Sequence, residues 1–337
     1  MKRNYWEIVQ AMPAAELTRL MRRFEDLGLY GVWVPQLHAP PFPTMAAIAM
    51  ATTRMQIGSG IAFAFTRSPL ETALNALDID RLSGGRTVLG LGTSVRTFNE
   101  RAHGATYGKP VAHLREVVEA VRAIIERGAT GQLGELSGEY HKLDLRGLTT
   151  RKPVRASIPI WVPALFKNTI VMGAKTADGV MGHPIWSLKA ITESSKIVDE
   201  TLAAAGRPRA QFHVNIWNYA AVSNDRKQAI DDMRGTVANY SSIPQYEKFY
   251  EAHGFGDAAR AVIAAASRGD TAAMLKAVPD EMVTTFAIAG TPDEAGERVE
   301  KIWPHADSMT ISPPQYFVPP DRLNGYRDAI INTFYKA

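Results

Sequence analysis

The chain has 337 residues, 46% of them hydrophobic, so it is long enough to bury one large core or two ordinary ones. It contains no cysteine, which excludes disulfide bonds, thiolate metal sites, iron–sulfur clusters and a cysteine nucleophile. Its 38 basic and 34 acidic residues are spread along the chain and leave a net charge of +4, so nucleic-acid binding is not indicated.

The N-terminal segment does not have the pattern of an export signal. Its basic start at Lys2 and Arg3 is followed by Glu7 and Gln10 before an apolar core can form. No apolar run approaches the roughly 18 residues that a membrane-spanning helix needs. We therefore expect a cytoplasmic protein that does not enter the membrane.

Short β-branched or aromatic runs alternate with long amphipathic stretches along the chain, a pattern typical of βα units around a parallel sheet. Eight runs are predicted to be strands: 5–9, 31–35, 55–62, 87–92, 158–162, 179–181, 212–222 and 308–311. Eight stretches are predicted to be helices: 14–27, 44–53, 69–82, 110–127, 168–176, 187–205, 226–239 and 292–303. Because eight strands close a barrel with a packed interior, the predicted fold is a (β/α)8 TIM barrel of the α/β class.

Several of the predicted helices have good boundary signals. Thr291 followed by Pro292 combines an N-cap residue with a proline at the first helical position. Gly28, Gly128 and Gly206 lie where helix C-caps are expected.

One segment departs from the alternation. Residues 240–289, after the seventh predicted strand, have the pattern of further helices that end near 279–282. In a barrel this segment would be an insertion in a βα connection, at the face where substrates bind. A helical decoration that only packs or dimerises fits most of these residues equally well. No linker divides the chain, so we expect residues 1–337 to form a single domain.

Two common kinds of catalytic site are not indicated. The eight histidines are scattered, without His-x-His or His-Glu-x-x-His spacing, so no metal site is expected. The Gly-x-Ser-x-Gly motif of α/β-hydrolases is also missing from the sequence.

Five segments resemble the luciferase-like flavin and deazaflavin oxidoreductases. They are LGLYGVWVP at 27–35, TTRMQIGSGI at 52–61, DRLSGGRTVLGLGT at 80–93, the HG, KP and LRE pieces of 103–116, and IPIWV with ADGV within 158–180. Each is weak alone, because glycine after a helix and small residues in a strand are ordinary features. Together, in this order, they identify the chain as a member of the luciferase-like superfamily, which implies a TIM barrel.

The C-terminal third indicates a branch of this superfamily. DEMV at 280–283 and FAIAGTPDE at 286–294 look like coenzyme F420-dependent enzymes similar to methylenetetrahydromethanopterin reductase. The resemblance implies an oxidoreductase that transfers a hydride between the deazaflavin coenzyme F420 and a small organic substrate. Two alternatives stay open: an FMN-dependent monooxygenase that uses reduced flavin and oxygen, and a barrel that binds a flavin without catalysis.

His38 follows the second predicted strand, one residue later than the histidine that related deazaflavin enzymes place beside the ring. The resemblance implies that His38 binds the cofactor and is catalytic, because an imidazole can donate a proton or polarise a substrate as hydride arrives. A histidine in a proline-rich loop is also often a local hydrogen-bonding partner.

The end of the third strand resembles the place where the family has a non-prolyl cis peptide behind the deazaflavin. In this chain the peptide corresponds to Gly60 and Ile61, and Ala62 follows. The resemblance implies that all three contact the cofactor. A plain strand with glycines that allow close packing is the alternative.

The fourth strand ends in small residues that let a flat ring approach the backbone. Gly92 and Thr93 are therefore expected at the cofactor. The segment is not a dinucleotide-binding fingerprint, because its third glycine and the following acidic residue are missing. Asn99 resembles an asparagine of the family that contacts the ring.

After the fifth strand, family members bind the coenzyme phosphate with backbone amides at the start of the next helix. The corresponding residues here are Ala164, Leu165, Phe166 and Lys167. Where relatives usually have Gly-Pro, this chain has Phe166 and Lys167, which removes a flexible residue and adds a cation.

The sequence does not select the substrate beyond a small molecule. Trp186, Trp217, Tyr316 and Phe317 are candidates for its pocket, although aromatic residues near strand ends are more often part of the core or the rim. A homodimer is expected from the resemblance.

Overall fold

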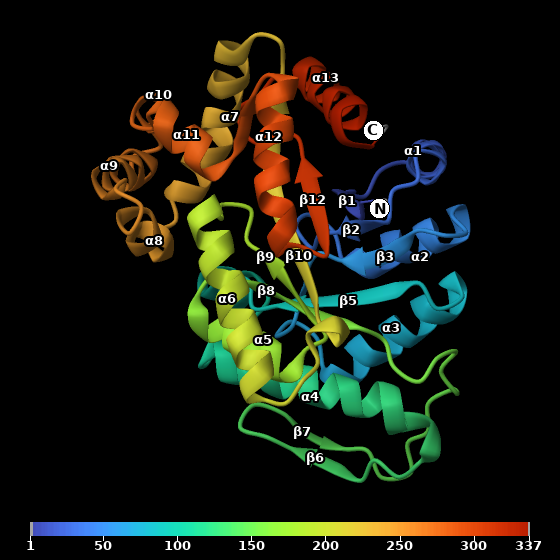
Figure 1. The fold of residues 1–337 in the computed structure, drawn as a ribbon. Coiled ribbons are helices and arrows are strands. Elements are labelled where there is room, and N and C mark those ends of the chain that lie inside the picture. The colour runs from blue at the N-terminus through green and yellow to red at the C-terminus, as the bar shows by residue number, and fades with distance from the viewer. Residues whose placement is uncertain (1–2, 336–337) are drawn as a thin grey trace. The chain divides into compact units, whose positions relative to one another are not determined.

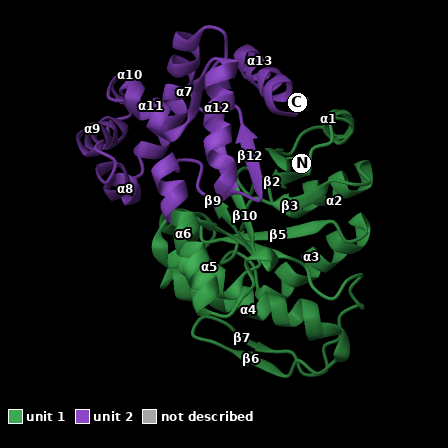
Figure 2. Ribbon diagram, viewed as in Figure 1, with its two compact units in different colours: residues 1–181, 194–215 green, residues 182–193, 216–337 purple. Residues whose placement is uncertain are grey.

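The computed structural model describes residues 3–335. They group into two compact units (Figure 2). Unit 1 consists of Met1–Met181 and Ser194–Asn215, and unit 2 consists of Gly182–Glu193 and Ile216–Ala337.

Unit 1 is built on a parallel sheet whose strands are hydrogen-bonded in chain order (Figure 1). The strands are β1 (Tyr5–Ile8), β2 (Gly31–Val34), β3 (Gln56–Ser59), β5 (Thr87–Gly92), β8 (Ile160–Ala164), β9 (Gly179–Gly182) and the first residues of β10 (His213–Val222). A short strand, β4 (Ala62–Phe63), pairs with the end of β5. Parallel strands place their carboxyl ends at one edge of the sheet, which is where βα loops can form a site.

The helices of unit 1 connect these strands. They are α1 (Ala14–Asp26), α2 (Pro41–Ala51), α3 (Pro69–Ser83), α4 (Pro110–Arg127), α5 (Lys167–Thr176) and most of α6 (Leu188–Ala204). Helix α2 packs against α3, α3 against α4, and α4 against α5. A hairpin of β6 (Glu135–Ser137) and β7 (Lys142–Asp144) follows α4.

Unit 2 contains the rest of β10 and most of the C-terminal elements. These are α7 (Arg226–Ser241), α8 (Glu247–Glu251), α9 (Gly256–Ala266), α10 (Thr271–Lys276), α11 (Asp280–Phe286), β11 (Ile288–Gly290), α12 (Pro292–Ile302), β12 (Ser308–Ser312) and α13 (Pro320–Ile330). Strand β11 pairs in parallel with the end of β10. Helix α12 begins with a full capping box between Thr291 and Glu294.

Eight strands, each followed by helix, have the element order of a (β/α)8 barrel, and the predicted fold class is confirmed. Residues 240–289 contain the expected helical segments, together with β11, which the sequence pattern does not predict. The hairpin β6–β7 and the helix α13 are also absent from the prediction. Within residues 3–335, no helix combines the length and the apolar character needed to cross a membrane.

Most predicted bounds agree with the structure to within two residues, and two elements differ more. The third strand, expected over 55–62, is broken into β3 and β4 by the turn at 60–61. Helix α2 begins at Pro41 rather than Thr44, because prolines are well tolerated in the first turn of a helix, where the amide protons have no helical acceptor.

Tryptophan side chains fill the interior of unit 1. The rings of Trp6 and Trp33 are stacked with centroids 4.0 Å apart, and Trp161 is tilted against both. A Cβ atom at Gly31 would lie 2.5 Å from Trp6 Cζ3, and one at Gly58 would lie 2.0 Å from Trp33 Cζ3. Gly31 in the first family segment and Gly58 in the second are therefore explained by packing.

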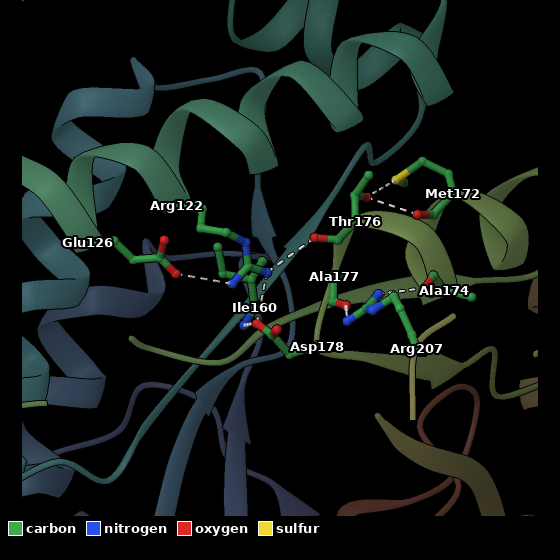
Figure 3. A network of polar contacts seen from close by, with 9 residues as sticks. All are labelled: Arg122, Glu126, Ile160, Met172, Ala174, Thr176, Ala177, Asp178 and Arg207. Atoms are coloured by element: carbon green, nitrogen blue, oxygen red, sulfur yellow. Dashed lines mark hydrogen bonds and ion pairs between the residues drawn. The ribbon is translucent and has the colours of Figure 1, made fainter. Parts of the chain in front are cut away.

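A polar network joins the amino-terminal ends of β8 and β9 (Figure 3). Arg122 on α4 donates to Asp178 Oδ2 at 2.9 Å and to the Thr176 carbonyl at 3.1 Å. The Ile160 N–H donates to the same carboxylate oxygen at 2.8 Å. Arg207 donates to the carbonyls of residues 174 and 177. Because barrel sites form at the opposite ends of the strands, we assign this network to stability.

Two further residues of the family segments brace amino-terminal strand ends. Asp80 is buried, accepts from the Thr87 N–H at 3.1 Å and forms an ion pair with Arg155 at 2.7 Å. Arg86 donates to the Met55 carbonyl at 2.8 Å and to three further acceptors between residues 49 and 52. These two residues of the family segments therefore stabilise the barrel and do not belong to the candidate site.

Candidate functional site

The turn between β3 and β4 carries the cis peptide that the resemblance implied. The Gly60–Ile61 bond is cis. Gln36, just after β2, holds this turn from both sides. Its N–H donates to the Ile61 carbonyl at 3.1 Å, and its Oε1 accepts from the Phe63 N–H at 3.0 Å. Gln36 therefore fixes Ile61 at the carboxyl edge of the sheet.

Arg67 extends this arrangement. Its Nη2 donates to Gln36 Oε1 at 2.9 Å, and its guanidinium lies 5.2 Å from the centroid of the Phe42 ring. Burial lowers the pKa of Arg67, and its buried Nη1 has no hydrogen-bond partner. Neither Gln36 nor Arg67 was among the residues that sequence patterns predict for the site.

His38 lies in the loop between β2 and α2, two residues after Gln36. Its side chain is exposed. The loop begins at the same sheet edge as Ile61, so the position fits the predicted contact with a ring. The catalytic role of His38 stays a prediction.

Three separately predicted segments meet at Gly92, the last residue of β5. A Cβ atom there would lie 2.2 Å from Ile61 Cδ1 and 2.7 Å from Pro163 Cγ. Ile61 belongs to the cis peptide, and Pro163 precedes Ala164 in β8. The structure thus brings the ends of β3, β5 and β8 together at one glycine. Ala62, beside Ile61, is fully buried and pairs with Leu91 of β5.

The loop after β5 is held by Asn99. Its Nδ2 donates to the carbonyls of Thr93 at 2.8 Å and Val95 at 3.0 Å, while Oδ1 is buried and has no partner. Ser94 in this loop has a positive φ of 51°, an uncommon conformation for a residue with a side chain. Asn99 therefore braces the loop and keeps one unused acceptor, which is compatible with the predicted ring contact.

A stack of rings supports the same loop from outside. The Tyr107 hydroxyl donates to the Ser94 carbonyl at 3.1 Å, and the Tyr107 carbonyl accepts from His113 Nδ1 at 3.2 Å. The His113 ring lies between Phe65 and Tyr140, with centroid distances of 3.8 Å and 4.0 Å. Burial lowers the pKa of His113. No sequence motif indicates this support, because its members are far apart in the chain.

The loop after β8 leads directly into α5. Ala164 is buried, Leu165 is partly buried and Phe166 is 44% exposed. Phe166 is the N-cap of α5 and makes no side-chain capping bond, and the exposed Lys167 is the first helical residue. An uncapped helix start beside a cation suits an anion. The predicted phosphate contact of these four residues stays a prediction.

Unit 2 contains a second group of polar side chains, which we call the neutral cluster. It consists of His183, Asn218, Tyr219, Tyr240, Tyr246 and Gln315. His183 follows β9, Asn218 and Tyr219 belong to β10, and Gln315 follows β12. Sequence patterns did not indicate this cluster, since tyrosine and asparagine in a strand carry no spacing signal.

Hydrogen bonds connect the tyrosines of the neutral cluster. The Tyr219 hydroxyl donates to Gln315 Oε1 at 2.5 Å, which leaves it to accept from Tyr240 at 3.1 Å. The Tyr246 hydroxyl lies 3.2 Å from His183 Nε2. Burial raises the pKa of Tyr219 and of Tyr240 well above the ordinary value, and it lowers the pKa of His183 to about 3. All of these groups are therefore uncharged at neutral pH.

The four aromatic residues proposed for a substrate pocket have different environments. Trp186 is fully buried, and Trp217 is partly buried and donates to Ser312 Oγ at 3.2 Å. Tyr316 is partly buried, and Phe317 is 54% exposed with a positive φ of 60°. Trp186 fits a core role.

In the part of the chain that the structure describes, no three histidine or carboxylate side chains gather as a metal site.

Comparison with known proteins agrees with this geometry. A family model for luciferase-like monooxygenase matches residues 3–304. The 5,10-methylenetetrahydromethanopterin reductase of Archaeoglobus fulgidus is 31% identical over 306 residues, which is 88% of each chain.

Two solved structures show the same fold. The coenzyme F420-dependent tetrahydromethanopterin reductase of Methanopyrus kandleri has a TM-score of 0.81 at 21% identity and covers 99% of this chain and 98% of its own. The oxygenating constituent of 3,6-diketocamphane monooxygenase from Pseudomonas putida, in complex with FMN, has a TM-score of 0.69 at 15% identity and covers 99% and 98%. The chain belongs to the luciferase-like monooxygenase family, and its predicted resemblance to coenzyme F420-dependent reductases is confirmed.

Proposed function

We propose that this protein is an oxidoreductase that transfers a hydride between coenzyme F420 and a small organic substrate. The observation that carries the proposal is the convergence of Ile61, Gly92 and Pro163, because it joins the predicted ring-binding and phosphate-binding segments at one edge of the sheet. The 31% identity to a methylenetetrahydromethanopterin reductase supports the choice of coenzyme.

The residues at this edge fit a deazaflavin. Gly92 lets Ile61 and Pro163 pack closely at this edge, and the buried Asn99 Oδ1 is an acceptor without a partner. A deazaflavin offers ring N–H groups to such an acceptor. The start of α5, with Lys167, suits its phosphate.

The bound coenzyme would supply the hydride chemistry, and the protein would position the reactants. Ile61 and Gly92 would back the ring, and Asn99 would orient it through Oδ1. His38 would hold or donate a proton at the substrate atom that becomes more basic as hydride arrives. Lys167 and the backbone amides at the start of α5 would bind the coenzyme phosphate.

An FMN-dependent monooxygenase is the second candidate. The FMN complex of the Pseudomonas putida enzyme, which has the same fold, supports it. The two candidates differ in what accepts electrons from the reduced cofactor, since a monooxygenase needs oxygen and a hydride transferase does not.

Parallel fluorescence titrations of the purified protein with coenzyme F420 and with FMN test the proposal. We expect tight binding of F420 and weak binding of FMN. The reverse preference would overturn the choice of coenzyme and favour the monooxygenase. Binding of F420 without oxidation of its reduced form by any substrate in a screen would favour a non-catalytic flavin-binding protein.

We also propose that the protein acts as a homodimer in the cytoplasm. This follows from the resemblance to the family. Sedimentation analysis at several concentrations tests the homodimer, and a single species at the monomer mass of 36.9 kDa would contradict it.

A further inference from the structure

The neutral cluster of unit 2 contains two buried polar atoms without partners. These are Nδ1 of His183 and Oδ1 of Asn218. Buried polar atoms are almost always hydrogen-bonded in folded proteins, so each exception requires an explanation. One of these atoms lies just after β9 and the other on the neighbouring strand β10, and two such atoms indicate a ligand.

The two residues meet at the turn that follows β9. Asn218 on β10 is only 2% exposed, and its Nδ2 makes a long bond of 3.4 Å to the Trp186 carbonyl. The Trp186 N–H donates to the His183 carbonyl at 2.9 Å, which closes the turn that follows β9. The Asn218 side chain thus reaches the backbone of the turn that His183 begins.

The protonation of His183 can be assigned from its neighbours. Burial holds its pKa at about 3, and no charged side chain contributes to this shift, so the imidazole is neutral. The Tyr246 hydroxyl lies 3.2 Å from Nε2, and we assign it as the donor to an Nε2 that lacks a proton. The remaining proton is then on Nδ1, which is a donor without an acceptor.

The surroundings of these atoms are aromatic and uncharged. The His183 ring makes edge contacts with Tyr240 and Tyr246 at centroid distances of 5.5 Å and 5.1 Å. Electrostatic effects on the pKa of Tyr219 come only from Tyr240 and Tyr316. Among the described residues of the neutral cluster, none carries a positive charge that could compensate a buried anion, and an unpaired buried charge is strongly unfavourable.

We infer that His183 and Asn218 form a ligand subsite within unit 2 for an uncharged planar group with both an acceptor and a donor, as an amide has. Nδ1 of His183 donates to the carbonyl oxygen of that group, and Oδ1 of Asn218 accepts from its N–H. A carboxylate or a phosphate is excluded. The inference goes beyond the proposed function and concerns unit 2 alone.

Benzamide and benzoate are the probes, because they are nearly isosteric and differ in charge and in the N–H donor. Ligands of this size bind matching sites at about millimolar Kd. The full-length protein is labelled with 15N-histidine, and each probe is titrated while the imidazole resonances are recorded. We expect benzamide to shift the His183 resonance and to bind at least about tenfold more tightly than benzoate.

Variants locate the binding. His183→Phe and Asn218→Leu should each weaken benzamide binding about tenfold, and His305→Gln is the matched control that should not. Equal or tighter binding of benzoate, no shift of the His183 resonance, or unchanged binding by both variants would overturn the inference. The comparison of the two probes on the unmodified protein needs no variant and stays valid if a variant misfolds.

The titration with coenzyme F420 separates this inference from the proposed function. If benzamide binds at His183 but the protein does not bind F420, the subsite is supported and the proposed coenzyme is wrong. If F420 binds but benzamide does not, the proposed coenzyme is supported and the inferred subsite is wrong.

Discussion

The Cδ1 methyl group of Ile61 lies 2.2 Å from the point that a Cβ atom on residue 92 would occupy. Ile61 lies in the break between β3 and β4, and Gly92 ends β5. The glycine at position 92 is thereby required by the packing of its neighbours.

Gly92→Ala should weaken binding of coenzyme F420 by about tenfold or more, because the new methyl group must displace Ile61 or Pro163 from the predicted ring site. Fluorescence titration measures the change. The matched control is Gly296→Ala on α12, where a Cβ atom meets nothing within 4 Å. Unchanged F420 affinity in Gly92→Ala would place the ring elsewhere.

Lys167→Ala should weaken binding of coenzyme F420 about three- to tenfold, because it removes a cation from the start of α5. The loss should shrink as salt is raised, since salt screens exposed charges. Titrations at low and high ionic strength measure both effects. Lys175→Ala, in the last turn of the same helix, is the control. Equal losses in the two variants would contradict a phosphate site at the helix start.

Local patterns in the sequence predict most of the barrel. The structure gives β5 and α4 the predicted bounds, because a Gly-Gly turn precedes the strand and a proline begins the helix. The hairpin β6–β7 was missed because its strands have only three residues each. Strand β11, also of three residues, is too short to show a periodicity.

The candidate site could be predicted only where it lies in continuous segments. The cis peptide at 60–61 could be predicted because the family resemblance covers that stretch, and the structure confirms it. Gln36 and Arg67 meet across 31 residues of sequence, and His183 and Tyr246 meet across 63. Such pairs depend on which loops the fold brings together, so a single sequence does not reveal them.

Asp178→Asn should lower the free energy of unfolding by about 1–3 kcal/mol, because Arg122 loses its carboxylate partner at the start of β9. Thermal unfolding followed by circular dichroism measures the loss. Coenzyme affinity should stay unchanged, since the network lies at the amino-terminal strand ends. Asp144→Asn removes a solvent-exposed ion pair with Arg146 and should leave thermal unfolding unchanged. A larger effect in Asp144→Asn than in Asp178→Asn would refute the assignment.

His38→Gln should reduce kcat by about 100-fold or more and leave F420 affinity nearly unchanged, if the imidazole transfers a proton. Stopped-flow oxidation of reduced F420 with an identified substrate measures the effect. His305→Gln, in unit 2, is the control. A loss of F420 affinity without loss of kcat would instead make His38 a binding residue.

His183 should make the stability of the protein depend on pH. Its pKa is about 3 in the folded chain and about 6.5 when unfolded, so between these values the unfolded state holds one more proton. The stabilising contribution is complete above about pH 6.5 and is lost at about 1.4 kcal/mol per pH unit as the pH falls towards 3. Urea unfolding between pH 7 and pH 5 measures the slope.

His183→Gln should flatten this slope by one proton, because glutamine stays neutral at every pH in the range. It should be less stable at pH 7 but lose less stability on acidification. His103→Gln, which changes an exposed histidine, should retain the slope of the unmodified protein. If His183→Gln and the unmodified protein have parallel pH profiles, His183 is protonated in the folded chain and the neutral tautomer that we assign to it is wrong.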